Sequence, residues 1–445
     1  MPGELFTGMF VPERVQEATS DRAWLQAMLD AEAALAASEA EAGLIPGKAA
    51  EAIGEACDAG DFDLEAVGLD AHRVAVPVVP LVRALRDRLD DETAGYAHYG
   101  ATSQDIMDTA GMLVARRALT AIDEEADGVA AACAGLAEEH RETLMAGRTL
   151  LQHGLPTTFG LKAAGWLDSV VSARARLGSV SLAVQFGGAA GTLASLGEGG
   201  ERVVALVAKR LELEDPAIPW HTARLRVADL GASLALMAGA LEKISLDVVL
   251  LSQTEVAEVA EASGGGRGGS STLPHKRNAV GSVLAIACAR RVRGAAGVLL
   301  AAMPQEHERA AGAWQSEWGP LTEALAMTGG AAGAVREALD GLEVRADRMR
   351  ENLEATGGLL MAESVVAALG ERVGRGRARE LVDAASDRAL DAGTPLREQL
   401  VGNPGVSAEL SEQEIDRALD PAGYLGSADA FIDRALSRYR GDRGR

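Results

Sequence analysis

The chain is poor in aromatic side chains and in positive charge. Its 445 residues include six Phe, five Trp and four Tyr, and 43 Lys and Arg stand against 65 Asp and Glu, for a formal net charge of −22. Proteins that bind single-stranded nucleic acid need aromatic platforms and a basic groove, so this composition argues against nucleic acid as a partner. The acidic balance also argues against an anionic membrane surface.

The chain also has few cysteines and lacks the sequence patterns of a signal peptide or a membrane span. Cys57, Cys133 and Cys288 are widely spaced and odd in number, which fits neither a disulfide framework nor a zinc cluster. We expect them to be small buried apolar residues. The first residues lack the basic start and apolar run of a signal peptide, and no uncharged apolar run is long enough to span a membrane. These features predict a cytoplasmic protein.

Only 14 prolines occur, and their positions organise the chain. A proline inside a helix removes a hydrogen bond and clashes with the preceding turn, so long helices lie between prolines. The proline-free windows are 81–155, 157–215, 220–273, 275–303 and 321–394. Within them apolar residues recur three or four positions apart, as at Leu241, Ile244 and Val248, while alternating strand patterns are nearly absent. The sequence therefore predicts an all-α fold.

The composition shifts near residue 108 and again near residue 355, where Thr356, Gly357 and Gly358 interrupt the helical pattern. We predict three helical domains, namely 1–108, a central bundle of long helices at 109–355, and 356–445. In the last of these, Ser411 and Glu414 have the spacing of a capping box for a late helix. Long amphipathic helices bury their apolar stripes in bundles that often include helices of other subunits, so we expect a homo-oligomer.

The densest group of reactive side chains lies in segment 264–278, GGGRGGSSTLPHKRN. Five glycines in six residues precede hydroxyl groups and cations, a composition that favours a loop closing over an anion rather than a plain linker. Ser270 can act as a base if Lys276 and backbone N–H groups stabilise its alkoxide. The spacing of a nucleotide-binding P-loop is absent.

Segment 270–278 resembles the Ser-Ser-x-Met-Pro-x-Lys-x-Asn signature of the fumarase/aspartase superfamily. Segment 98–105, HYGATSQD, resembles the Thr-Ser loop of that superfamily, and 147–160 resembles its second region. Segments 185–192, QFGGAAGT, and 303–309, MPQEHER, point more narrowly to the bacterial 3-carboxy-cis,cis-muconate cycloisomerases. The resemblance runs from about residue 5 to about residue 435.

This resemblance implies an all-α homotetramer whose active sites each collect segments from three subunits. It implies a small polycarboxylate substrate, an aci-carboxylate intermediate and no cofactor. The matching positions imply Ser270 as the base, Lys276 and Asn278 as carboxylate anchors, and further hydrogen-bond donors at Thr102, Ser103 and Gln152. A dianionic intermediate needs fixed donors and cations where its charge develops, so the assignment is physically sensible.

Other candidate residues are weighed against ordinary structural roles. His153 follows the Gly-Arg-Thr motif and is the best remaining imidazole for catalytic proton transfer; the alternative is a histidine that supports the loop. Arg148, Arg224 and Arg226 are predicted substrate-binding residues, because arginine suits bidentate carboxylate recognition; for Arg224 and Arg226, packing or an internal salt bridge is the alternative. No metal site is predicted for Glu306, Glu308 and Glu317, because no paired histidines stand at ligand spacing.

Two replacements bear on the substrate. Many amine-releasing members of the superfamily carry His where this chain has Leu150 and Glu where it has Val283, and without that pair a poor leaving group lacks its acid. A cycloisomerisation, in which a substrate carboxylate closes onto a double bond, does not need that acid, and neither does nitrite release. A third replacement argues against a cycloisomerase. Cycloisomerase-like sequences carry a polar residue, which could contact a substrate carboxylate, where this chain has Val76.

Three functions follow, in order of preference. The first is a cycloisomerase that converts 3-carboxy-cis,cis-muconate to its carboxymuconolactone in the protocatechuate branch of aromatic degradation. The second is a β-eliminating lyase that releases fumarate from a substituted succinate, with nitrosuccinate favoured over argininosuccinate and adenylosuccinate. The third, a non-catalytic homologue, conflicts with the intact Ser270, Lys276 and Asn278.

Overall fold

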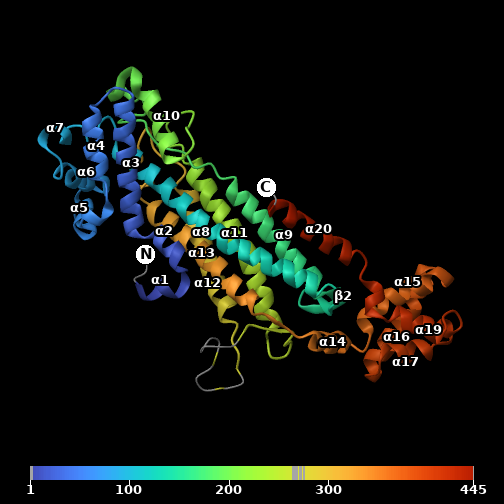
Figure 1. The fold of residues 1–445 in the computed structure, drawn as a ribbon. Helices are drawn as coiled ribbons and strands as arrows, with labels where there is room; N and C mark the ends of the chain where they lie inside the picture. The colour runs from blue at the N-terminus through green and yellow to red at the C-terminus, as the bar shows by residue number, and fades with distance from the viewer. Residues whose placement is uncertain (1–3, 263–268, 270–272, 274–275, 444–445) are drawn as a thin grey trace. The chain divides into compact units, whose positions relative to one another are not determined.

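The computed structural model describes the chain except residues 1–3, 263–268, 270–272, 274–275 and 444–445 (Figure 1). The described chain is largely helical, which confirms the predicted all-α fold. Alanine-rich windows with a helical apolar period form the longest elements, among them the 37-residue helix α8 (Ser103–Glu139). The three cysteines are buried, as expected.

The chain divides into two compact units, each assembled from three segments. The first contains Met1–Asp127, Ser172–Glu242 and Leu284–Val335, and the second contains Gly128–Val171, Lys243–Val283 and Arg336–Arg445. The division falls inside five long helices, which are α8, α9 (Phe159–Gly178), α11 (Leu225–Leu251), α12 (Val280–Ala301) and α13 (Trp318–Asp340). The division into domains at 1–108, 109–355 and 356–445 stays a prediction.

The first unit contains the N-terminal helices. Helix α3 (Asp21–Glu41) begins after Ser20, whose hydroxyl accepts a hydrogen bond from the Ala23 N–H, and it lies beside α4 (Figure 1). The Trp24 indole N–H donates to the Thr322 hydroxyl at 2.9 Å and so ties α3 to α13. The other elements are α1 (Glu4–Phe10), α2 (Glu13–Thr19), α4 (Gly47–Glu55), η1 (Ala59–Asp61), α5 (Leu64–Val74), α6 (Val78–Arg86), α7 (Asp91–Ala94), η2 (Ala194–Gly199) and α10 (Gly200–Leu211).

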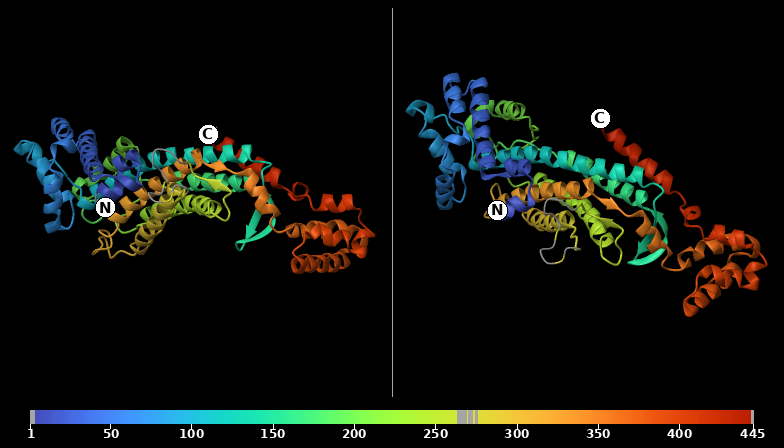
Figure 2. Two further views of the ribbon diagram at one scale, coloured as in Figure 1. Left: turned by 90° about the horizontal axis from the view of Figure 1, so that it is seen from below. Right: turned by 60° about the horizontal axis from the view of Figure 1, so that its bottom comes forward.

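The second unit contains the C-terminal helices, of which α15, α16, α17 and α19 form one group around buried aliphatic side chains (Figures 1 and 2). The predicted capping box is confirmed, because the Ser411 hydroxyl accepts from the Glu414 N–H and the Glu414 carboxylate accepts from the Ser411 N–H. The helical elements are α14 (Ala346–Glu354), η3 (Leu359–Met361), α15 (Ala362–Val373), α16 (Arg375–Ala392), α17 (Leu396–Val401), α18 (Pro404–Ser407), α19 (Glu412–Ala418), η4 (Pro421–Tyr424) and α20 (Ala428–Arg443).

The second unit also contains two antiparallel strand pairs, which the sequence pattern did not predict. Strand β1 (Leu144–Thr149) pairs with β2 (Gln152–Thr158), with Thr149 opposite Gln152 and an irregularity between Ala146 and Arg148. The shorter pair joins β3 (Val259–Ala260) to β4 (Glu343–Val344). The β1–β2 segment carries glycine and proline and has no β-branched alternation, so its strand state depends on tertiary contacts rather than on local propensity.

Over the described residues, no single helix is long and apolar enough to cross a membrane. One pair meets that criterion jointly, by length and composition, and consists of α14 and Leu359–Val373, which are bent by 79° from each other. The cytoplasmic location stays a prediction.

Candidate active site

Thr102 and Ser103 lie at the N-terminus of α8, in the first unit. The backbone before them takes left-handed conformations, with φ of 63° at His98 and 67° at Gly100. A Cβ atom at Gly100 would approach Leu196 Cδ2 to 2.4 Å, so only glycine fits there. Thr102 and Ser103 are half-buried, and this turn places their hydroxyl groups at the end of a long rigid helix.

Asp105 holds this turn in place. Its carboxylate is fully buried and accepts hydrogen bonds from the backbone N–H groups of Thr102, Gly187 and Gly188 at 2.9–3.0 Å. His221 Nε2 lies 2.6 Å from the same carboxylate. The two motif segments 98–105 and 185–192, far apart in sequence, are thus joined by one side chain.

His98, in the same turn, pairs with a carboxylate of helix α3. Its Nδ1 lies 2.6 Å from Glu32 Oε1 on α3. Burial lowers the pKa of His98, but the charge of Glu32 and the hydrogen bond to it outweigh burial, so the pKa is raised overall. Val76, the residue that replaces a polar side chain, is buried near the start of α6.

Arg224 is an internal ion-pair residue. Its side chain is 1% exposed, and its guanidinium donates to Asp108 at 2.6 and 2.9 Å and to Glu317 at 2.5 Å. Although burial lowers the pKa of Arg224, the two carboxylates hold it above its usual value; burial raises the pKa of Glu317. The salt-bridge alternative therefore describes Arg224, because a buried guanidinium between two carboxylates is closed to a substrate.

Arg226 also points to internal partners. Its guanidinium donates to the Ser181 hydroxyl and lies 3.6 Å from Glu214. Its predicted role in substrate binding stays a prediction, and the observed geometry matches the salt-bridge alternative.

Arg309 is a functional candidate that the sequence interpretation did not single out, although its motif was recognised. Its guanidinium donates to the carbonyl oxygens of Gly188 at 2.7 Å, Ala189 at 3.1 Å and Glu308 at 3.2 Å. Within the described residues no carboxylate lies in ion-pair distance of it, and burial lowers its pKa. A half-buried guanidinium held by neutral carbonyls beside the Gly187–Gly188 turn retains its charge for an anion.

In the second unit the β1–β2 hairpin carries Arg148, Gln152 and His153. Arg148 forms a bidentate ion pair with Glu258 at 2.6 and 2.9 Å, and the fully buried Glu258 also accepts from the Asn352 amide. This pairing holds the hairpin next to its tip, where Arg148 is opposite His153, and it occupies the cation that was predicted to bind substrate.

Gln152 is exposed and His153 half-buried on β2. Burial and the nearby Arg148 charge lower the pKa of His153, which favours a neutral imidazole at pH 7. Leu150, at the position that carries histidine in many amine-releasing relatives, is 97% exposed at the hairpin tip.

Ser270 lies outside the described residues. Lys276 and Asn278 are described and exposed, and the Lys276 N–H donates to the Leu273 carbonyl at 3.0 Å. Glu261 accepts from the N–H groups of Gly281 and Ser282, both at 2.9 Å, and so caps the start of α12. The described residues thus contain two separate groups of candidate side chains, one in each unit.

Comparison with known proteins gives consistent matches. The family described as "Lyase" matches residues 11–294, and the family described as "Adenylosuccinate lyase C-terminus" matches residues 358–435. A 3-carboxy-cis,cis-muconate cycloisomerase of Bradyrhizobium diazoefficiens is 46% identical over 98% of this chain and 98% of its own. A nitrosuccinate lyase of Streptomyces davaonensis is also 46% identical, over 97% of this chain and 94% of its own. The crystal structure of the 3-carboxy-cis,cis-muconate lactonizing enzyme of Pseudomonas putida matches with a TM-score of 0.94 and 42% identity, covering 99% of this chain and 100% of that one.

Proposed function

The chain belongs to the fumarase/aspartase superfamily, and from this membership we propose that it is a cycloisomerase. It acts without a cofactor and converts 3-carboxy-cis,cis-muconate to its carboxymuconolactone. This reaction belongs to the protocatechuate branch of aromatic degradation, and relatives named 3-carboxy-cis,cis-muconate cycloisomerase match 98% of the chain. The protein is thus an enzyme acting on a small polycarboxylate.

The observation that carries the proposal is the pair Leu150 and Val283. Both side chains are exposed hydrocarbons, 97% and 55% exposed, at the two positions where many amine-releasing relatives carry an acid–base pair. A hydrocarbon cannot protonate a departing amine, so elimination of a poor leaving group lacks its acid here. Lactone formation releases no leaving group and is unaffected by this loss.

The chemistry needs one proton and one developing anion. A substrate carboxylate oxygen forms a C–O bond to one carbon of a double bond, and the π electrons move to the carbon beside another carboxylate as an aci-carboxylate. That carbon then takes a proton from the enzyme, and the enzyme recovers one from solvent. Ser270, the base in the reverse direction, is the proton donor in this direction, and Lys276 and Asn278 anchor the carboxylate on which charge accumulates.

The described geometry supports a division of roles among the remaining residues. Thr102 and Ser103, fixed by Asp105, supply hydroxyl donors, and Gln152 supplies an amide donor from the hairpin tip. His153, with its lowered pKa, relays protons as a neutral imidazole. Arg309 binds a substrate carboxylate in place of Arg224, which is enclosed by its own carboxylate partners.

We also propose a homotetramer with shared active sites. Apolar side chains on α11 and α12 of the first unit are exposed in a single chain, including Leu225, Leu236 and Val298. Exposed leucines along long helices are typical of interfaces between subunits in helical bundles.

The substrate assay is direct. The purified enzyme should consume 3-carboxy-cis,cis-muconate, seen as loss of diene absorbance without formation of fumarate, and should leave argininosuccinate and adenylosuccinate unchanged.

The Ser270→Ala variant should lose at least about a hundredfold in turnover, as expected for loss of a general acid–base group. The Arg309→Met variant should raise the KM for the substrate by about tenfold or more, whereas Arg226→Met should leave it nearly unchanged.

Nitrosuccinate elimination is the second candidate, favoured by the nitrosuccinate lyase relative and by Val76. Nitrite leaves as a stable anion and needs no acid. Formation of nitrite and fumarate from nitrosuccinate, with the diene untouched, would reject the cycloisomerase proposal. Activity on argininosuccinate would reject both candidates, because it requires an acid in place of the missing pair.

A further inference from the structure

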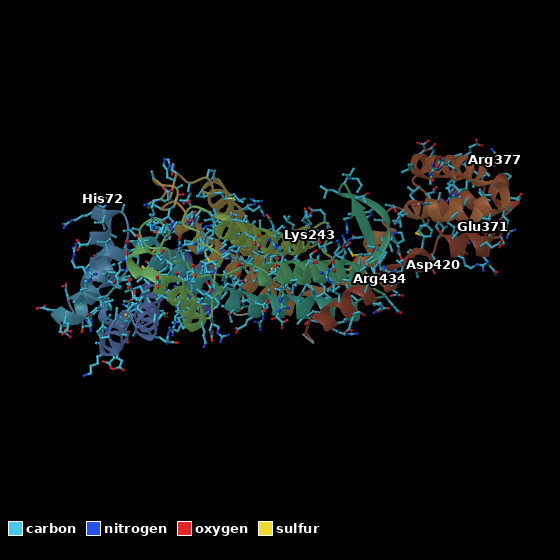
Figure 3. All side chains as sticks on the ribbon, turned by 90° about the horizontal axis from the view of Figure 1, so that it is seen from above. His72, Lys243, Glu371, Arg377, Asp420 and Arg434 are labelled. Carbon is cyan, nitrogen blue, oxygen red and sulfur yellow. The ribbon has the colours of Figure 1, made fainter. Side chains whose placement is uncertain are left out.

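A cavity of about 330 Å³ lies in the second unit, between α9 and α11. On α9 its lining includes Lys162 and Trp166, one helical turn apart, and on α11 it includes Lys243 and Asp247, also one turn apart. The lining also includes the hydroxyl-bearing residues Thr157 of β2, two positions before α9 begins, and Ser169 of α9. Figure 3 labels Lys243. None of these residues belongs to the candidate active site described above.

The carboxylate in this cavity already has its partners. Asp247, whose side chain is 12% exposed, accepts a hydrogen bond from the Trp166 indole N–H at 2.7 Å and forms an ion pair with Lys243. Lys162 Nζ lies 3.9 Å from the same Asp247 oxygen, which is beyond hydrogen-bond distance. One carboxylate therefore faces two ammonium groups, and the cavity carries one uncompensated positive charge.

Lys162 is the uncompensated group. Its side chain is only 26% exposed, and within the described part of the chain its ammonium group makes no hydrogen bond. Burial lowers the pKa of Lys162, while Asp247 opposes that effect. Arg148 and Glu258 also act on Lys162, but they form an ion pair whose opposite charges oppose each other and supply no net counter-charge. A poorly hydrated ammonium without a hydrogen-bond acceptor is unfavourable, and an anion in the cavity removes that cost.

We propose that this cavity is a binding site for a small organic monocarboxylate, held by the ammonium group of Lys162. A ligand with one negative charge neutralises the one uncompensated positive charge of the cavity. Its volume lies at the lower end of the range for small-molecule sites, about 300–1,000 Å³, which suits a ligand of benzoate size and excludes a nucleotide. The half-buried Leu161 contributes apolar lining for the body of the ligand.

The test is calorimetric titration of the purified full-length enzyme with benzoate and with the uncharged analogue benzamide. Benzoate should bind with a saturable isotherm, and benzamide should not. The Lys162→Met variant, which keeps the aliphatic stem, should weaken benzoate binding at least tenfold, whereas Lys48→Met, at an exposed position on α4, should leave it unchanged. Binding to the wild type should also weaken as the pH rises and Lys162 loses its proton.

Three outcomes would overturn the proposal. If benzamide binds as well as benzoate, no carboxylate is recognised. If Lys276→Met abolishes benzoate binding while Lys162→Met retains it, the carboxylate occupies the predicted substrate site instead. If Lys162→Met leaves benzoate binding unchanged and alters the sedimentation coefficient, Lys162 serves as a contact between copies of the chain. Circular dichroism of each variant shows that the comparison is made between folded proteins.

Discussion

At the scale of single residues, the buried carboxylates of the first unit differ in how they are compensated. Asp105 receives several hydrogen bonds, and Asp108 and Glu317 share the guanidinium of Arg224. Glu39 on α3 is fully buried, and neither of its carboxylate oxygens has a hydrogen-bond partner in the described structure. Burial, with a smaller contribution from Glu32, raises the pKa of Glu39 to about 8. Glu39 is therefore a neutral acid over most of the physiological range.

This raised pKa predicts how stability depends on pH. Between pH 4.5, the ordinary pKa, and about 8, the folded chain keeps a proton that the unfolded chain has lost. The free energy of unfolding should therefore fall as the pH rises through this window. Glu39→Gln should match the wild type near pH 5 and exceed it at pH 8 by on the order of a few kcal/mol.

Urea denaturation at pH 5, 6.5 and 8 measures this difference. Glu51→Gln, at an exposed position on α4, is the matched control and should show no such trend. A stability difference between Glu39→Gln and wild type that is constant with pH would mean that Glu39 titrates normally.

At the scale of single elements, the β1–β2 hairpin is the least expected structure in the chain. Its two turn residues, Leu150 and Leu151, have φ of 50° and 66° and are 97% and 75% exposed. Two-residue turns with positive φ at both positions favour Asn-Gly, and a left-handed conformation costs other residues about 1–2 kcal/mol each. An exposed, strained and apolar tip beside Gln152 and His153 indicates a functional contact rather than optimisation for folding.

Replacement of Leu150-Leu151 by Asn-Gly tests this interpretation. The new turn relieves the backbone strain, so the helical circular dichroism should be unchanged. Turnover should nevertheless fall by about tenfold or more, because the functional contact that we infer for the apolar tip is lost. Leu69→Asn, at an exposed position on α5, should have no effect on turnover. Full activity in the Asn-Gly variant would show that the leucines make no functional contact.

At the scale of the whole molecule, the chain combines a net charge of −22 with exposed leucines on its long helices. The charge discourages non-specific association, so the apolar side chains on α11 and α12 favour a specific partner. A second copy of the chain fits this requirement, since helical bundles often recruit helices from identical subunits. The candidate residues lie far apart in the sequence, in regions that include those near 102, near 152, near 276 and near 309.

Mixing inactive variants tests whether these regions act across subunits. Thr102→Ala and Lys276→Ala, each nearly inactive alone, should regain activity after denaturation and refolding together, with about a quarter of the sites intact in an equal mixture. The matched control is the pair Ser270→Ala and Lys276→Ala, which changes two residues of the same short sequence segment and should stay inactive in the mixture. Failure of the first pair to regain activity in refolded oligomers would place each complete site within one subunit.

The sequence alone determined the all-α class, the long helices between prolines, the buried cysteines, the capping box at Ser411 and the superfamily. These features depend on local propensity, apolar period and short motifs, which are readable along the chain. Only the tertiary structure decided which arginine side chains are held in internal ion pairs. Arg224 pairs with carboxylates 116 and 93 positions away, and Arg148 pairs with one 110 positions away. Such pairing depends on how distant elements pack, so the sequence could not distinguish these two arginines from Arg309, whose guanidinium donates hydrogen bonds to carbonyl oxygens among the described residues.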